Sequence, residues 1–304
     1  LKDDMLKEVL NDAENQKKDA QQQKEKLVVL SEQIGKYIPP QIHQALLSGK
    51  YDTRITTRRR KLTVFFSDIK NFTTISEDLQ PEDLTKYLNE YFSEMTAIAL
   101  ACGATIDKYI GDAMMVFFGD PDSKGEHEDA RSCVEMALQM QEKMKVLHKK
   151  WRNGGFLHPF EIRMGINTGY CNVGNFGSNQ RLTYTIIGGQ VNVAQRLEAA
   201  AEANGILISH ETYAHTQDML VVEDRPSIQM KGINRDIKIF AIKSRAPVTK
   251  NHSEKEKKPK EEDSLDVSPD KENTISLQTL QIEILDLNSK IQILENMVKE
   301  LTKG

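Results

Sequence analysis

The sequence predicts an α+β fold, a ferredoxin-like βαββαβ sandwich with additions, flanked by N- and C-terminal coiled-coil helices. Over residues 62–244, short apolar strands alternate with amphipathic helices in the order strand, helix, strand, strand, helix, strand. In residues 1–36 and 274–304, apolar residues recur every three or four positions, which is the heptad pattern of a coiled coil.

The first half of the predicted domain begins with KLTVFF, an apolar run typical of a buried strand. We expect a helix to start at Pro81 and to stop at Gly103, because proline is favoured in a first helical turn and glycine after a last one. The next segment, ATIDKYIGDAMMVFF, predicts two strands joined through Ile110, Gly111 and Asp112.

The second half continues with a helix at about residues 126–149. FEIRMGIN alternates like a strand, and LTYTII predicts another. VNVAQRLEAAAEANG predicts a helix closed by Gly205, and short strands with one small helix complete the domain to about Lys243.

The N-terminal segment, residues 1–36, is rich in Gln, Lys and Glu, and Gln16 and Gln23 interrupt its heptad seam. Such a seam favours a coiled coil that loosens or slips, and a plain solvated helix is the alternative. Pro39 and Pro40 end the helix. Residues 37–61 form a lead-in to the domain.

The C-terminal part has two segments. Residues 245–273 are charged and contain almost nothing apolar, so we expect a disordered linker. Residues 274–304 carry four unbroken heptads with mostly β-branched residues at one seam position and leucine at the other, which favours a parallel two-stranded coiled coil. Ile282, Leu285 and Ile293 lie outside that seam, so a higher assembly or a docking face is the alternative.

Composition argues against several classes of protein. The net charge of −4 gives no reason to expect a nucleic-acid partner, and the one dense basic run, residues 58–61, is interpreted as a solvated approach to a strand. No apolar stretch approaches the ~20 residues that span a bilayer, and no signal-peptide pattern is present. Cys102, Cys133 and Cys171 lack metal-ligand spacing, so we expect reduced thiols in a cytoplasmic protein.

Two aspartates lie where a strand ends or turns. Asp68 directly follows VFFS, and Asp112 lies between two predicted strands beside Gly111. Two carboxylates that face each other raise each other's pKa unless a cation lies between them. Together with a backbone carbonyl they suit Mg²⁺ or Mn²⁺, which completes its shell with substrate phosphate. The alternative is a pair of turn-capping aspartates.

Asn192 and Arg196 are four residues apart on the predicted helix of VNVAQRLE and therefore share one face. An arginine opposite a metal–phosphate centre stabilises the charge that develops during phosphoryl transfer. By itself this spacing is typical of a solvated helix face, so its meaning depends on the two aspartates.

Four segments occur together in this chain: FFSDIKNFT, DKYIGDAMMVFFG, TYTIIGGQVNVAQRLE and QMKG. Over about residues 38–243 the sequence resembles the catalytic domain of class III nucleotide cyclases, the adenylyl and guanylyl cyclases. YIPPQIHQALLSGKYD resembles the lead-in found in many bacterial members. One position departs from the family, because Gly189 stands where the family usually has Asp.

The resemblance implies a site for two divalent metals, Mg²⁺ or Mn²⁺, held by Asp68, Asp112 and the Ile69 carbonyl. It also implies that Asn192 orients the ribose and that Arg196 stabilises the transition state. In the family, each active site forms between two head-to-tail chains, so the resemblance implies a homodimer with two equivalent sites.

The resemblance further implies that Lys231 contacts the terminal phosphates and that Lys108 and Thr185 read the purine. Adenine presents an acceptor at N1 and a donor at N6, which a lysine and a threonine hydroxyl fit, whereas guanine presents the opposite pattern. We therefore expect an adenylate cyclase of the subgroup with Thr at this position, converting ATP to 3′,5′-cyclic AMP and pyrophosphate. Guanylate cyclase and a weakly active, cyclase-like dimerisation module are the alternatives.

The terminal heptads lead to a hypothesis about regulation. An N-terminal coil would carry a twist from an upstream sensor domain into the dimer interface. A C-terminal coil would raise the effective concentration of the partner domain.

Overall fold

The computed structural model describes residues 2–49, 54–178, 180–230 and 233–247. The chain divides into two units, Leu1–Val248 and Thr249–Gly304. Nearly all of the predicted linker, the whole predicted C-terminal coil and Lys231 lie outside the described residues.

Two helices precede the domain, α1 (Lys2–Gly35) and α2 (Pro40–Leu47). The predicted break at the prolines is confirmed, and Pro40 also begins the second helix. Several apolar side chains of α1 are half or more exposed in the single chain, namely Leu27, Val28, Val29, Leu30 and Ile34. The helix is therefore as predicted, while its pairing with another helix stays a prediction.

Helix α2 is tied to the domain by specific contacts. Ile42 is buried in the core, and Gln41 Nε2 donates a hydrogen bond of 2.8 Å to the Ala104 carbonyl. Ser31 and His43 form a hydrogen bond of 3.0 Å between the end of α1 and α2. The lead-in thus packs against the domain through its second helix.

The predicted βαββαβ order is confirmed, with one short helix between β1 and β2 that the sequence analysis did not predict. Its strands are β1 (Thr57–Ile69), β2 (Thr105–Ile110), β3 (Ala113–Phe118) and β4 (Ile162–Ser178). Its helices are α3 (Phe72–Asp78), α4 (Pro81–Ala101) and α5 (Glu126–Asn153). The strands lie side by side in the order β2-β3-β1-β4, all antiparallel.

The additions enlarge this sheet into a mixed one. They are β5 (Arg181–Ile187), α6 (Gly189–Ala200), β6 (Ile206–Ser209), α7 (His210–Thr216), β7 (Leu220–Met230) and β8 (Ile233–Arg245). The sheet continues from β4 through β6, which is parallel to it, to β8 and β7, while β5 pairs with the far half of β4.

The end of α6 corrects the sequence prediction. The helix ends at Ala200, because Ala201 has extended backbone dihedrals of −72° and 145°. Gly205 instead closes a turn in which its N–H bonds the Glu202 carbonyl, while the Asn204 N–H bonds the Ile162 carbonyl. The chain leaves the helix early because β6 must run beside β4.

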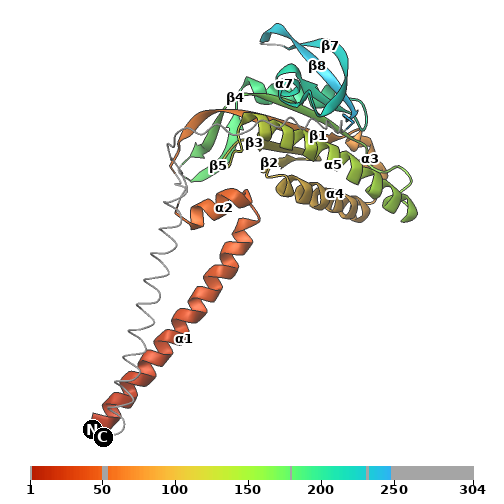
Figure 1. Cartoon of the computed structure of the whole chain (residues 1–304). Coiled ribbons are helices and arrows are strands. Elements are labelled where there is room, and N and C mark those ends of the chain that lie inside the picture. The colour runs from red at the N-terminus through yellow and green to blue at the C-terminus, as the bar shows by residue number, and fades with distance from the viewer. Residues whose placement is uncertain (1, 50–53, 179, 231–232, 248–304) are drawn as a thin grey trace, which may run out of the picture. The chain divides into compact units, whose positions relative to one another are not determined.

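From Leu62 onward, strand β1 is buried on both faces, as the apolar run KLTVFF predicted. Phe65 packs on the face covered by α4 and α5, which lie side by side in Figure 1. Val64 and Phe66 pack on the opposite face with Ala194 of α6. The sheet therefore lies between two apolar layers.

A glycine in β4 sets the position of α6. A Cβ atom on Gly165 would lie 2.1 Å from the Glu198 backbone nitrogen and 2.4 Å from the Ala194 carbonyl oxygen. Only a residue without a side chain permits this backbone contact. Gly165 thus lets the helix that carries Asn192 and Arg196 lie directly on the sheet.

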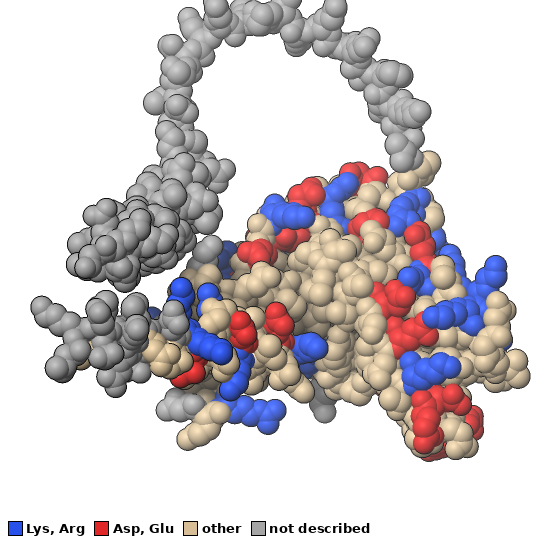
Figure 2. Space-filling model, turned by 90° about the horizontal axis from the view of Figure 1, so that it is seen from below, with Lys and Arg blue, Asp and Glu red and all other residues tan. Residues whose placement is uncertain are grey.

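The basic run lies on β1 and is paired within the chain. Arg58 forms an ion pair with Asp120 at 2.8 Å, and Lys61 one with Glu126 at 2.9 Å. On the face drawn in Figure 2, basic and acidic side chains are interspersed on either side of an uncharged area. No helix within the described part of the chain has the length and apolar character to cross a membrane.

Candidate active site

The two aspartates singled out by sequence lie together. Pairing of β1 with β3, with Ser67 opposite Met114, places the end of β1 beside the turn that precedes β3. Gly111 has φ +65°, which lets the chain turn tightly into Asp112. Asp112 Oδ2 accepts a hydrogen bond of 3.0 Å from the Ile69 N–H, and its carboxyl lies close enough to Asp68 for that carboxyl to raise its pKa.

This arrangement is electrostatically unfavourable without a cation. Burial and the neighbouring carboxyl of Asp68 raise the pKa of Asp112 to about 7, although the Ile69 N–H works in the opposite direction. The fully buried Tyr91, whose hydroxyl lies 3.3 Å from Ser67 Oγ, has its pKa raised by burial and by both aspartates. A divalent cation between the carboxylates would remove this repulsion.

The donor set fits a hard divalent cation. The ligands offered are the carboxylate oxygens of Asp68 and Asp112, which suit Mg²⁺ and Mn²⁺ better than softer metals. Among the described residues no group of three His, Cys, Asp or Glu side chains converges. Asp68 and Asp112 thus supply less than a full shell, which leaves positions for phosphate oxygens of a substrate.

Two further residues support this pair, and sequence reasoning missed both. Arg163 on β4 lies opposite Asp68 in the strand register, and its Nη2 is 2.8 Å from Asp68 Oδ2. Its Nε lies 2.6 Å from Glu198 Oε1 on α6. Burial raises the pKa of Glu198 to about 7, against the lowering effect of Arg163. The sequence predicted a strand at FEIRMGIN, which contains Arg163. It did not predict the register that places Arg163 opposite Asp68.

The predicted Asn192 and Arg196 lie on the outer side of α6. Asn192 is exposed and Arg196 is half-buried, while Glu198 on the same helix points inward. Neither Asn192 nor Arg196 forms a hydrogen bond or ion pair with any residue that the structure describes. Within one chain they are therefore not joined to Asp68 and Asp112.

The predicted purine-reading pair does come together. Lys108 on β2 and Thr185 on β5 are far apart in sequence, yet Lys108 Nζ lies 3.1 Å from Thr185 Oγ1. Asp107, which sequence reasoning missed, contacts both of them. Its carboxylate lies 3.0 Å from Lys108 Nζ and accepts a hydrogen bond of 2.5 Å from the Thr185 hydroxyl.

The glycine that departs from the family begins α6. A Cβ atom on Gly189 would meet no atom within 4 Å, so the fold leaves room for a side chain there. The first turn of α6 has no acidic residue and no side-chain cap. The missing carboxylate is therefore not imposed by packing.

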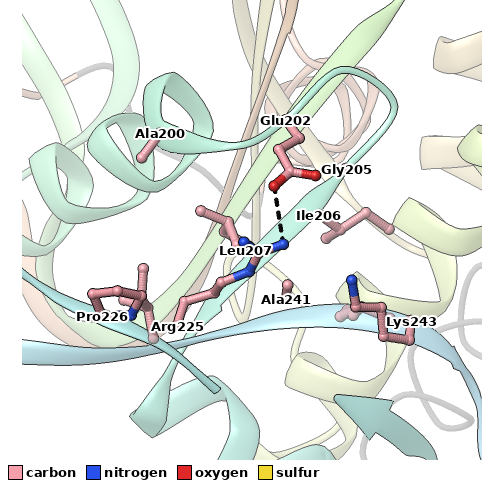
Figure 3. A pocket seen from close by; sticks show the side chains of 11 residues that line it. Ala200, Glu202, Gly205, Ile206, Leu207, Arg225, Pro226, Ala241 and Lys243 are labelled. Atoms are coloured by element: carbon pink, nitrogen blue, oxygen red, sulfur yellow. Dashed lines mark ion pairs between the residues drawn. The ribbon is translucent and has the colours of Figure 1, made fainter. Parts of the chain in front are cut away.

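The cavity in Figure 3 is separate from both groups of site residues. It has a volume of about 280 Å³ and lies between the segment that links α6 to β6 and the strands β7 and β8. Its most prominent polar feature is an ion pair of 3.0 Å between Arg225 and Glu202. None of the predicted site residues lines it.

Comparison with known proteins agrees with this fold. The family model described as "Adenylate and Guanylate cyclase catalytic domain" matches residues 56–244. The chain therefore belongs to the adenylate and guanylate cyclase catalytic domain family.

Individual relatives include both kinds of cyclase. Adenylate cyclase 1 of Rhizobium meliloti is 32% identical over 209 residues, which cover 68% of this chain and 31% of that protein. The membrane guanylyl cyclase of Dictyostelium discoideum is 28% identical over 209 residues, covering 69% of this chain and 13% of that protein. The chain thus spans about a third or less of the length of these relatives.

Solved structures give the same result. The adenylyl cyclase CyaB from P. aeruginosa superposes with a TM-score of 0.61 and 53% identity, covering 62% of this chain and 97% of that one. The guanylyl cyclase Cya2 superposes with a TM-score of 0.60 and 34% identity, covering 64% and 98%. The domain is a nucleotide cyclase domain, and its higher identity is to the adenylyl cyclase.

Proposed function

We propose that this chain is an adenylate cyclase that converts ATP to 3′,5′-cyclic AMP and pyrophosphate in a homodimer. The observation that carries the proposal is the contact of Lys108 with Thr185 at 3.1 Å, which occurs together with the carboxylate pair Asp68–Asp112 in one cyclase domain. The 53% identity to an adenylyl cyclase structure, against 34% to a guanylyl cyclase, supports the same substrate.

The reaction is an internal displacement on ATP. The ribose 3′-oxygen forms a bond to the α-phosphorus, the bond from that phosphorus to the α,β-bridging oxygen breaks, and pyrophosphate leaves. Two divalent ions, when bound, would lower the pKa of the 3′-hydroxyl and neutralise phosphate charge. No side chain is required as general base, and the proton passes to solvent.

The residues of this chain would divide the remaining work. Asp68, Asp112 and the Ile69 carbonyl would hold the metals, and Arg163 would keep Asp68 in place through its 2.8 Å ion pair. Lys231 would contact the terminal phosphates. Lys108 would donate to adenine N1, and Thr185 would accept from the N6 amine.

The position of Asn192 and Arg196 on the outer side of α6 supports a shared active site. Asn192 and Arg196 have no partner among the described residues, so they are available to a second chain. In the proposed homodimer they would orient the ribose and stabilise the pentavalent phosphorus of the neighbouring site. Two chains related by a twofold axis would then form two equivalent sites.

The experiment that tests this proposal measures turnover of ATP and GTP with Mg²⁺ and with Mn²⁺, for the unmodified chain and for Asp68→Ala. We expect cyclic AMP from the unmodified chain and a loss of at least about 1,000-fold in the variant, because metal-based charge stabilisation contributes several kcal/mol. Equal turnover by the variant would contradict the metal assignment. Turnover of GTP alone would favour a guanylate cyclase.

A mixing experiment tests the shared site and the dimerisation-module alternative. Asp68→Ala and Arg196→Ala chains should each be inactive, and their mixture should regain activity because one heterodimer site keeps all residues intact. Absence of recovery at protein concentrations where heterodimers form would exclude sharing. Absence of any cyclic nucleotide from the unmodified chain would favour the dimerisation module.

A further inference from the structure

An irregularity in β2 places two consecutive side chains on one side of the sheet. In a regular strand, neighbouring residues point to opposite faces. Against β3, however, Ile106 pairs with Val116 and Lys108 with Met115, so Asp107 is the additional residue of a β-bulge. Asp107 and Lys108 can therefore both contact Thr185 on β5.

The hydrogen bonds around Asp107 determine which atoms donate. The Asp107 side chain is fully buried, and its Oδ2 accepts from the Thr185 hydroxyl at 2.5 Å and from the Ile186 N–H at 3.3 Å. A hydroxyl has one proton, and Thr185 donates it to Asp107. Toward any other group the Thr185 hydroxyl can therefore only accept a hydrogen bond. One lone pair accepts from Lys108 Nζ, and one is left for a ligand.

The same count leaves Lys108 as a donor. Its ammonium has three protons, of which one faces Asp107 Oδ1 at 3.0 Å and one faces Thr185 Oγ1 at 3.1 Å. The third remains for a ligand, and the side chain is 39% exposed. The pair thus presents one donor, Lys108, and one acceptor, Thr185. The hydrogen bonds to Asp107 determine these two roles.

We propose that Asp107 is a positioning residue that sets purine specificity by holding Thr185 as an acceptor and Lys108 as a donor. The inference rests on the proposed function, in which these two residues read the purine. Adenine, with an acceptor at N1 and a donor at N6, matches the pair. Guanine places N1–H against the lysine and O6 against a threonine oxygen that has no proton left to donate.

The test is the ratio of kcat/KM for ATP to that for GTP in the full chain carrying Asp107→Asn. Asparagine has the shape of aspartate but offers one acceptor and one donor, so either Lys108 loses its partner or Thr185 regains a proton to donate. A mismatched buried polar contact costs about 1–3 kcal/mol. We expect the value for ATP to fall about 10- to 100-fold and that for GTP to change by less than about threefold.

The matched control is Asp122→Asn, an exposed aspartate with no hydrogen bond or ion pair to the described residues. It should leave the ATP to GTP ratio unchanged. If Asp107→Asn lowers both substrates by the same factor, Asp107 only holds β2 to β5 and the proposal is overturned. An unchanged ratio with unchanged rates overturns it as well.

A second measurement needs no variant, and it decides the matter should Asp107→Asn fail to fold. Purine riboside triphosphate lacks the N6 amine but keeps N1, and the unmodified chain should use it at least about tenfold less well than ATP. If it is used as well as ATP, Thr185 is not held as an acceptor and the proposal fails. Absence of cyclic AMP from ATP itself would instead be a failure of the proposed function.

Discussion

The two ends of β3 each carry a buried or half-buried aspartate, and their surroundings are opposite. Asp120, after the strand, is fully buried and accepts from Arg58 Nε at 2.9 Å and Nη2 at 3.0 Å, as well as from the Tyr184 hydroxyl. Asp112, before the strand, is only half-buried, yet it faces a second carboxyl.

The two aspartates differ in the sign of the partner charge more than in depth of burial, since a cation and a hydroxyl face Asp120 and a second carboxyl faces Asp112. At Asp120 the donors compensate the carboxylate, so the fold is stabilised without any ligand. At Asp112 burial and Asp68 raise the pKa to about 7, so the charged form of this carboxyl is disfavoured until a cation lies beside it.

The largest effect is expected at Asp112, before β3. Asp112→Asn should lower cyclase activity by at least about 1,000-fold, because one metal ligand is lost. The same variant should raise the melting temperature of the metal-free chain, because the amide removes the repulsion with Asp68 and can still accept from the Ile69 N–H. Activity assays and metal-free thermal melts measure the two effects. A lower melting temperature would contradict the idea of repulsion.

At Asp120, after β3, we expect a large effect on stability and a small effect on activity. Asp120→Ala removes the acceptor for Arg58 and Tyr184, and because the Arg58 side chain is 44% exposed we expect a cost of about 2 kcal/mol of unfolding free energy, typical of a hydrogen bond to a charged group. Activity per folded molecule should fall less than about tenfold. Urea unfolding followed by circular dichroism checks the first value. A loss of activity with unchanged stability would place Asp120 in the functional machinery.

The pH dependence of stability should distinguish the two ends. The pKa of Asp112 is raised to about 7 in the folded chain from an ordinary value of 3.8, so the metal-free folded state binds more protons and loses stability as pH rises from about 4 to about 7. Melts of the unmodified chain and of Asp112→Asn at pH 5.5 and 8 should therefore differ more at pH 8. Saturating Mn²⁺ should reduce that difference, and a pH-independent difference would refute the assignment.

The smallest effect is expected at an exposed cation near Asp120. Arg60 Nε lies 3.7 Å from Asp120 Oδ2, but its side chain is 52% exposed and solvent screens the interaction. Arg60→Gln should change the free energy of unfolding by less than about 0.5 kcal/mol. Urea titration beside the unmodified chain checks this. A change comparable to that of Asp120→Ala would mean that Arg60 holds the carboxylate as firmly as Arg58 does.

Much of the fold and part of the site follow from local sequence patterns. Apolar runs and helix-start prolines predicted the elements, and their order predicted the α+β class. Asp68 and Asp112 were singled out because each stands beside a recognisable strand, whereas Lys108 and Thr185 came only from the resemblance to the cyclase family. Such patterns depend only on residues close in sequence.

Tertiary structure decided the contacts that complete the site. Three contacts join residues that are distant in sequence. The strand register sets Arg163 opposite Asp68, and the bulge in β2 lets Asp107 contact Thr185. Helix α6 packs against Gly165. The early end of α6 at Ala200 likewise follows from the path to β6. Local propensity carries no information about strand register or about where a helix crosses the sheet. Both depend on how strands and helices pack once they have formed.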